Sequence, residues 1–106
     1  MNAQATIQKA VDLLLAAAPR GSRVIVFGSY ARGQADLRSD LDLLVIEPRV
    51  EAPLAEMIRL RRVLRGLRMA VDLMVISQER FDYWKDTPNT LAYRVLKEGR
   101  AYEQVA

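Results

Sequence analysis

The architecture and the candidate chemistry are decided by residues 24–45, which are VIVFGSYARGQADLRSDLDLLV. One apolar run ends at Gly28 and Ser29, and the next begins inside an Asp-x-Asp triplet at residues 40–42. A Gly-Ser turn after a strand, expected to open a short helix over residues 29–32, can hold a triphosphate through backbone N–H groups. Two aspartates spaced by two on a strand share a face and can bind divalent cations. The pattern therefore indicates an enzyme that handles a nucleoside triphosphate.

The composition limits the kinds of site that the chain can build. Its 106 residues, 51% hydrophobic and 27% charged, fit one globular domain with a single core. The chain has neither cysteine nor histidine, which excludes disulfides, thiolate or imidazole metal sites and histidine general bases. Carboxylates remain as metal ligands, and these hard oxygen donors favour Mg²⁺ or Mn²⁺.

The charge balance and the apolar runs bear on location and partners. The net charge of +3 comes mostly from arginine and is compatible with a nucleotide, a nucleic acid or an acidic protein. No apolar run approaches the roughly 20 residues of a membrane span, and the N-terminus lacks the pattern of a signal peptide. We therefore expect a cytoplasmic protein that does not associate with membranes.

Apolar periodicity and helix breakers predict an α+β fold with a small mixed sheet. Helices are expected over residues 4–17, from 53 to about 67, from 78 onwards and over 91–97. Strands are expected over 23–27, 41–46, 69–76 and, at an edge, 100–105. Ser77 and Thr90 are the expected N-caps of the last two helices, and Gly99 is expected to end the final one.

Aspartates inside two of the predicted strands break the local pattern. Asp42 lies between two leucines, and Asp72 lies between Val71 and Leu73. Aspartate is depleted in strands, and an unpaired buried charge is costly, so a bound cation is the compensation that we expect. Two simpler explanations stay open: Asp40 as ordinary turn chemistry, and Asp72 as the partner of an arginine.

Two further features carry weaker predictions. Five arginines between Arg59 and Arg68 form a basic run on a predicted helix. A solvated face, or one that meets an acidic partner, is favoured over nucleic-acid binding, because no aromatic residues are interleaved with the arginines. Phe81 and Trp84 are expected in the core, and Tyr83 is left open.

Residues 24–45 resemble the signature of the nucleotidyltransferases of the DNA polymerase β superfamily, which is Gly-Ser, ten residues and Asp-x-Asp. The short chain is similar to the minimal nucleotidyltransferase branch, and Asp72 matches the position of the third carboxylate of the family. The tail from Val95 to Glu103 also looks familial. The resemblance implies a nucleotidyltransferase fold, with a small mixed β-sheet and helices packed largely on one side.

The resemblance also implies a role for each matching residue. Asp40 and Asp42 would bind both metal ions, and Asp72 would bind the catalytic ion and help to deprotonate the acceptor hydroxyl. The remaining positions would contact the nucleotide or support the site: Gly28 and Ser29 at the β- and γ-phosphates, Arg32 as a weaker phosphate contact and Ser39 as a supporting residue.

In the family that the chain resembles, minimal nucleotidyltransferases are typically paired with a small helical HEPN toxin. The implied activity is transfer of AMP from Mg-ATP to a tyrosine hydroxyl of that toxin, so that the chain would be its antitoxin in a hetero-oligomer, without direct nucleic-acid binding. Three alternatives stay open: a non-catalytic antitoxin that acts by occlusion, a small-molecule nucleotidyltransferase like those that modify aminoglycosides, and an enzyme that extends RNA.

Overall fold

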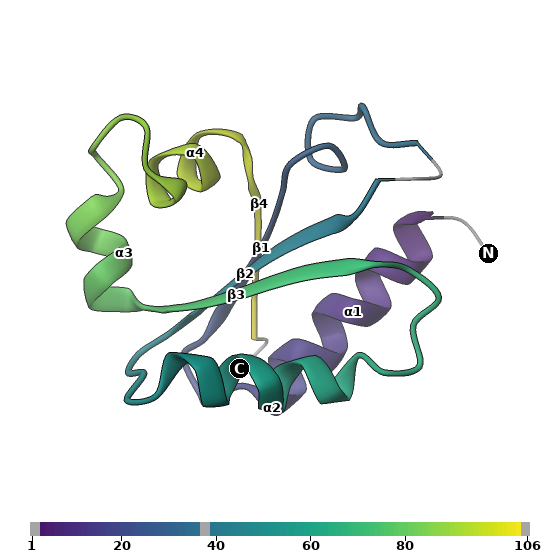
Figure 1. Ribbon diagram of the computed structural model, residues 1–106, viewed down its shortest axis with the longest axis horizontal. Helices are drawn as coiled ribbons and strands as arrows, with labels where there is room; N and C mark the ends of the chain where they lie inside the picture. The colour runs from purple at the N-terminus through teal and green to yellow at the C-terminus, as the bar shows by residue number, and fades with distance from the viewer. Residues whose placement is uncertain (1–2, 37–38, 105–106) are drawn as a thin grey trace.

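The computed structural model describes residues 3–36 and 39–104, and these form four helices and four strands (Figure 1). Among the described residues, no helix combines the length and the apolar character needed to cross a membrane. The elements, in chain order, are α1 (Ala3–Ala17), β1 (Arg23–Phe27), β2 (Leu41–Glu47), α2 (Pro53–Val63), β3 (Val71–Ser77), α3 (Gln78–Trp84), α4 (Leu91–Glu98) and β4 (Arg100–Glu103).

The element boundaries follow the predictions closely, and the differences lie at the ends. Ser77 accepts a hydrogen bond from the amide of Arg80, and Thr90 accepts one from the amide of Tyr93, so both predicted N-caps are confirmed. Helix α2 ends before residue 67, because residues 64–67 form successive turns with i to i−3 hydrogen bonds. Val105, the last residue of the predicted edge strand, lies outside the described residues.

The strands form one mixed sheet in the order β3-β2-β1-β4. Strand β1 is antiparallel to both β2 and β4, whereas β2 and β3 are parallel and are joined through α2. A parallel pair needs such a crossover, since a tight hairpin joins only antiparallel strands. The α+β class and the small mixed sheet are therefore confirmed.

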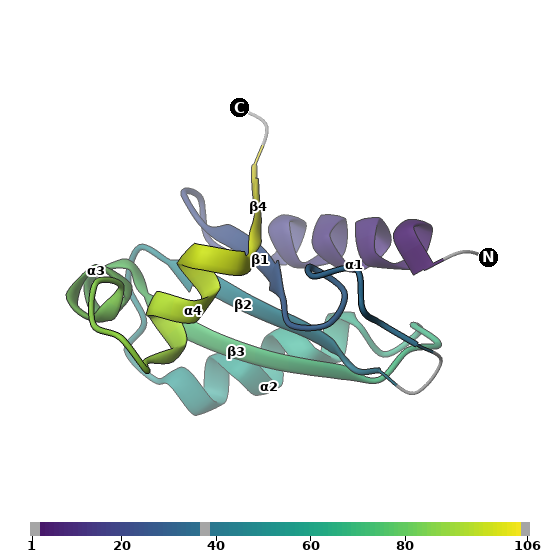
Figure 2. The ribbon, with the colours of Figure 1, turned by 90° about the horizontal axis from the view of Figure 1, so that it is seen from above.

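Helices cover both faces of the sheet (Figure 2). The two longest helices, α1 and α2, do share one face, as the resemblance implied, but α3 and α4 pack on the other. The reason is that β1 and β2 are apolar on both sides, as buried central strands are. On that face, β1, β2, α3 and α4 together form a second core cluster of seven buried residues: Ile25, Phe27, Leu44, Ile46, Phe81, Ala92 and Val95.

The aromatic residues of α3 divide between core and surface. Phe81 is 2% exposed and confirms the expectation of core packing. Trp84 is 39% exposed, so its predicted place in the core is wrong, and Tyr83 is 74% exposed. The two rings stack edge to face on the surface, with centroids 4.8 Å apart. The helix is only seven residues long, and its single buried position is taken by Phe81.

An acidic residue is buried where β2 ends against α2. Glu47 is 2% exposed, and its burial, together with a hydrogen bond to Glu56, raises its pKa to about 8. Glu56 is held ionised by two hydrogen bonds from Arg59, at 2.7 and 2.8 Å, which lower its pKa to about 2. Arg59 also donates to the carbonyl of Ala17 at 3.0 Å. This first member of the basic run therefore ties α2 to α1.

The buried Glu47 predicts a stability that falls as the pH rises. Its pKa is higher in the folded than in the unfolded protein. The stability that it contributes is therefore complete below the unfolded pKa and is lost as the pH rises through about 8. Between about pH 5 and pH 8, urea unfolding of the wild type should lose on the order of 1–3 kcal/mol. Glu47→Gln should flatten this decline. The exposed Glu103→Gln is the control and should decline like the wild type. An equally steep decline in Glu47→Gln would show that Glu47 is not the cause.

Candidate active site

Strand register brings two of the sequence-predicted carboxylates side by side. In the parallel pair of β2 and β3, Asp42 is directly opposite Asp72, and neighbouring strands lie about 4.8 Å apart. Asp42 is also opposite Phe27 of β1, so both aspartates belong to the face that α3 and α4 cover. Asp40 lies just before β2 begins. The three acids thus gather at one end of the central strands.

Neighbouring charges act on Asp42 in both directions. The pKa of Asp42 is raised, first by burial, then by the negative charge of Asp72 and, more weakly, by that of Asp40. Two cations oppose this effect and lower the pKa, Arg94 more than Arg32. Asp42 is half-buried, whereas Asp40 and Asp72 are exposed. An acid of raised pKa beside two further carboxylates is a place where an added cation would be favourable.

The donor set fits a divalent cation without forming a closed cage. Within residues 3–36 and 39–104, no three histidine, cysteine or acidic side chains are gathered tightly enough to hold a metal ion. The donors are nevertheless all carboxylate oxygens, which Mg²⁺ and Mn²⁺ prefer. Mg²⁺ commonly binds through one or two carboxylates and completes its shell with water and phosphate oxygens. The open arrangement is therefore compatible with a cation that arrives together with a phosphate.

Gly28 fits so closely against Asp42 that any larger residue would force the carboxylate to move. Its φ is 73°, in the left-handed region that glycine tolerates. A Cβ added at this position would collide with Oδ2 of Asp42. The turn after β1 can therefore approach the carboxylate only because the residue is glycine.

The chain after Gly28 forms turns in place of the short helix expected over residues 29–32. The amide of Arg32 donates to the carbonyl of Gly28 at 3.1 Å, and that of Gln34 donates to the carbonyl of Ser29 at 2.9 Å. Among the described residues, the amides of 29–31 have no hydrogen-bond acceptor. These three N–H groups are available to a phosphate, and a cation between that phosphate and the carboxylates would offset their mutual repulsion.

The remaining predicted residues have identifiable contacts. Ser39 Oγ accepts from the amide of Asp36 at 2.9 Å and donates to the Asp36 carboxylate at 3.3 Å, so the residue before Asp40 is held by two hydrogen bonds. Arg32 donates to Gln34 at 3.1 Å and to Glu98 of α4 at 3.2 Å. The loop is thereby attached to α4, a helix distant in the sequence.

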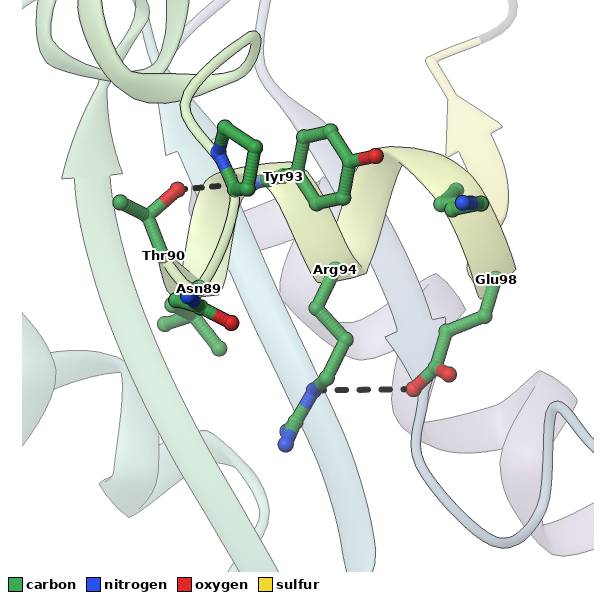
Figure 3. A pocket seen from close by; sticks show the side chains of 8 residues that line it. Asn89, Thr90, Tyr93, Arg94 and Glu98 are labelled. Carbon is green, nitrogen blue, oxygen red and sulfur yellow. Dashed lines mark hydrogen bonds and ion pairs between the residues drawn. The ribbon is translucent and has the colours of Figure 1, made fainter.

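Sequence reasoning missed Arg94 of α4. Its Nε lies 3.6 Å from Glu98 (Figure 3), and its guanidinium lies 5.4 Å from the centre of the Phe27 ring. It is the stronger of the two cations that lower the pKa of Asp42. The four-residue spacing of Arg94 and Glu98 signals an ion pair on a helix, but this spacing does not reveal that the pair lies beside the carboxylates.

The close approach at Gly28 predicts a large cost for one added methyl group. Gly28→Ala should destabilise the protein by on the order of 2–4 kcal/mol, through its positive φ and the collision with Asp42. Urea unfolding measures this loss. Gly66→Ala is the matched control, since its Cβ would meet nothing within 4 Å. Equal effects of the two substitutions would contradict the packing described.

The raised pKa of Asp42 predicts that removing its charge stabilises the protein. In the absence of ligands, Asp42→Asn should be more stable than the wild type at pH 7, because the amide has no charge to desolvate or to repel Asp72. Thermal and urea unfolding test this, with the exposed Asp86→Asn as the control. A less stable Asp42→Asn would contradict the electrostatic description.

Comparison with known proteins identifies the family of the chain. The family model for a nucleotidyltransferase domain matches residues 7–101. A crystal structure from Sulfolobus solfataricus, of a protein proposed to be a nucleotidyltransferase, has a TM-score of 0.59 and 26% identity over 77% of this chain and 73% of that one. A crystal structure of a toxin–antitoxin with AMP-PNP has a TM-score of 0.66 and 22% identity over 97% of this chain and 75% of that one, which establishes likeness of fold. No curated protein matches. The chain belongs to the nucleotidyltransferase domain family.

Proposed function

We propose that this protein transfers AMP from Mg-ATP to a tyrosine hydroxyl of a cognate HEPN-type toxin, and thereby acts as its antitoxin. The observation that carries the proposal is that Asp42 lies opposite Asp72 in the sheet, with the turn at Gly28 packed against the Asp42 carboxylate. Nucleotidyl transfer needs carboxylates beside a phosphate-binding turn, and both elements lie at the same end of the sheet. Membership of the nucleotidyltransferase domain family supports the same class of reaction.

The carboxylates of Asp40, Asp42 and Asp72 would hold the divalent cations, Mg²⁺ or Mn²⁺. When bound, such cations neutralise phosphate charge, activate the attacking oxygen and stabilise the departing one. The raised pKa of Asp42 supports this role, because cation binding would offset the repulsion among the three acids.

The other residues of the site would bind and orient the substrate. The free amides after Gly28 and the hydroxyl of Ser29 would receive phosphate oxygens, and Arg32 would offset their charge. Ser39 would hold the loop that presents Asp40. In the reaction, the acceptor oxygen forms a bond to the α-phosphorus, and Asp72 accepts its proton. The bond between the α-phosphorus and the bridging oxygen breaks, and pyrophosphate leaves with the electron pair.

A protein acceptor is supported by two observations. The crystal structure of a toxin–antitoxin with AMP-PNP shares the fold over 97% of this chain, so a toxin and an adenine nucleotide are the first ligands to test. Tyr83 and Trp84 also form an exposed aromatic pair on α3. Exposed aromatic side chains of this kind are typical of contacts with another protein.

Intact-mass spectrometry of the co-purified toxin tests the proposal directly. After incubation with Mg-ATP, the toxin should gain the mass of one or more adenylyl groups with the wild-type protein. The gain should be absent with Asp42→Asn and with Asp40→Asn, because each loses a carboxylate ligand. The exposed Asp86→Asn should transfer AMP at the wild-type level.

The same experiment separates the alternatives. An intact complex without any mass gain would favour neutralisation by occlusion. Transfer to an aminoglycoside or to RNA, but not to the toxin, would replace the proposed acceptor while keeping the reaction class. Mg-ATP should also raise the melting temperature of the wild type, since a ligand that binds only the folded state stabilises it.

A further inference from the structure

A hollow of about 560 Å³ opens beside α4 and the turn that precedes it. Six of the residues that line it are Asn89, Thr90, Tyr93, Arg94, Lys97 and Glu98 (Figure 3). Pockets for small organic ligands commonly measure about 300–1,000 Å³. The hollow is therefore large enough for the base and ribose of a nucleotide.

Arg94 connects this hollow to the candidate active site. Its side chain lines the hollow, and its guanidinium lies 5.4 Å from the centre of the Phe27 ring, where Phe27 is the residue that pairs with Asp42 between β1 and β2. A ligand in the hollow that extends past Arg94 would therefore run toward the end of the sheet that carries the carboxylates. Arg94 also pairs with Glu98, which in turn pairs with Arg32 at 3.2 Å. One carboxylate thus holds two arginines on the side of the site that faces the hollow.

The lining offers groups suited to a nucleobase. Tyr93 presents an aromatic ring that is partly buried, and the ammonium of Lys97 lies 5.4 Å from its centre. The side chain of Asn89 is exposed, so the donors and the acceptor of its amide can reach a base edge. An aromatic face together with an amide is a combination that proteins use to stack and hydrogen-bond bases.

We propose that the hollow beside α4 binds the base and ribose of the nucleoside triphosphate. In this arrangement Tyr93 stacks on the base, Asn89 contacts its edge, and Arg94 binds the triphosphate where it passes toward Asp42. Glu98 is a positioning residue, which orients both Arg94 and Arg32. The inference rests on the proposed nucleotidyl transfer and adds to it the residues that distinguish a nucleotide from a bare triphosphate.

The charges at the hollow favour the nucleotide over the acceptor as its occupant. Arg94 and Lys97 are both cationic, and the one acidic residue of the lining, Glu98, is already paired with two arginines. A cationic lining attracts a polyphosphate, whereas a neutral tyrosine hydroxyl gains little from it. The acceptor would then enter from the exposed side of Asp72.

Competition between two anions separates recognition of the base from that of the phosphates. Fluorescent N-methylanthraniloyl-ATP is bound in the presence of Mg²⁺ and displaced by ATP or by inorganic tripolyphosphate. Tyr93→Ala and Asn89→Gly should each weaken ATP about tenfold and leave tripolyphosphate within about twofold. Glycine is chosen at position 89 because Asn89 has a φ of 69°. Arg94→Met should weaken both competitors about tenfold or more, and Arg94→Lys should recover part of the loss.

Matched controls and opposite outcomes make the test decisive. Glu79→Gln and Arg80→Met change exposed residues of α3, outside the hollow lining, and should bind both anions like the wild type. Unchanged ATP affinity in folded Tyr93→Ala and Asn89→Gly, or an equal loss for both anions, would overturn the hollow as the base site while the proposed reaction stands. A wild type that binds neither anion would overturn both proposals.

Discussion

The parallel pairing of β2 with β3 is the constraint on which the rest of the structure depends. It sets Asp42 directly beside Asp72, two like charges that the sequence separates by thirty positions. The crossover that this pairing requires is α2, which covers one face of the sheet together with α1. A shift of one residue in this register would move one of the two acids to the opposite face. The fold and the candidate site are therefore fixed by the same contact.

The site is locally unfavourable, and neighbouring elements offset its cost. Burial and two other carboxylates raise the pKa of Asp42, while Arg94 and Arg32 lower it. At the other end of β2, Glu47 is also buried, but there α2 supplies Glu56 and Arg59 as partners. Asp42 remains accessible to solvent and ligands, whereas α2 covers Glu47. The same strand thus carries one acid suited to binding and one that joins elements.

Helix α4 has two physical roles that arise from its two sides. Ala92 and Val95 are buried against β1 and β2 and complete the second core cluster. Arg94 and Glu98 lie between that core and solvent, where they pair with each other and with Arg32. Packing of the apolar side fixes where the charged side lies. The arginines beside Asp42 are therefore positioned by hydrophobic burial as well as by their own ion pairs.

The sequence by itself determined the elements, the two N-caps at Ser77 and Thr90, the mixed sheet and the motif that ends in Asp42, because these depend on residue spacing and on hydrogen bonds within a few positions. Only the tertiary structure decided that helices cover both faces, that Trp84 is exposed, that Glu47 is buried and that Arg94 lies over the ring of Phe27, where its charge acts on Asp42. These facts depend on which distant segments pack together. Spacing along a helix gives the relative directions of its side chains, but contacts with the sheet decide which direction is inward.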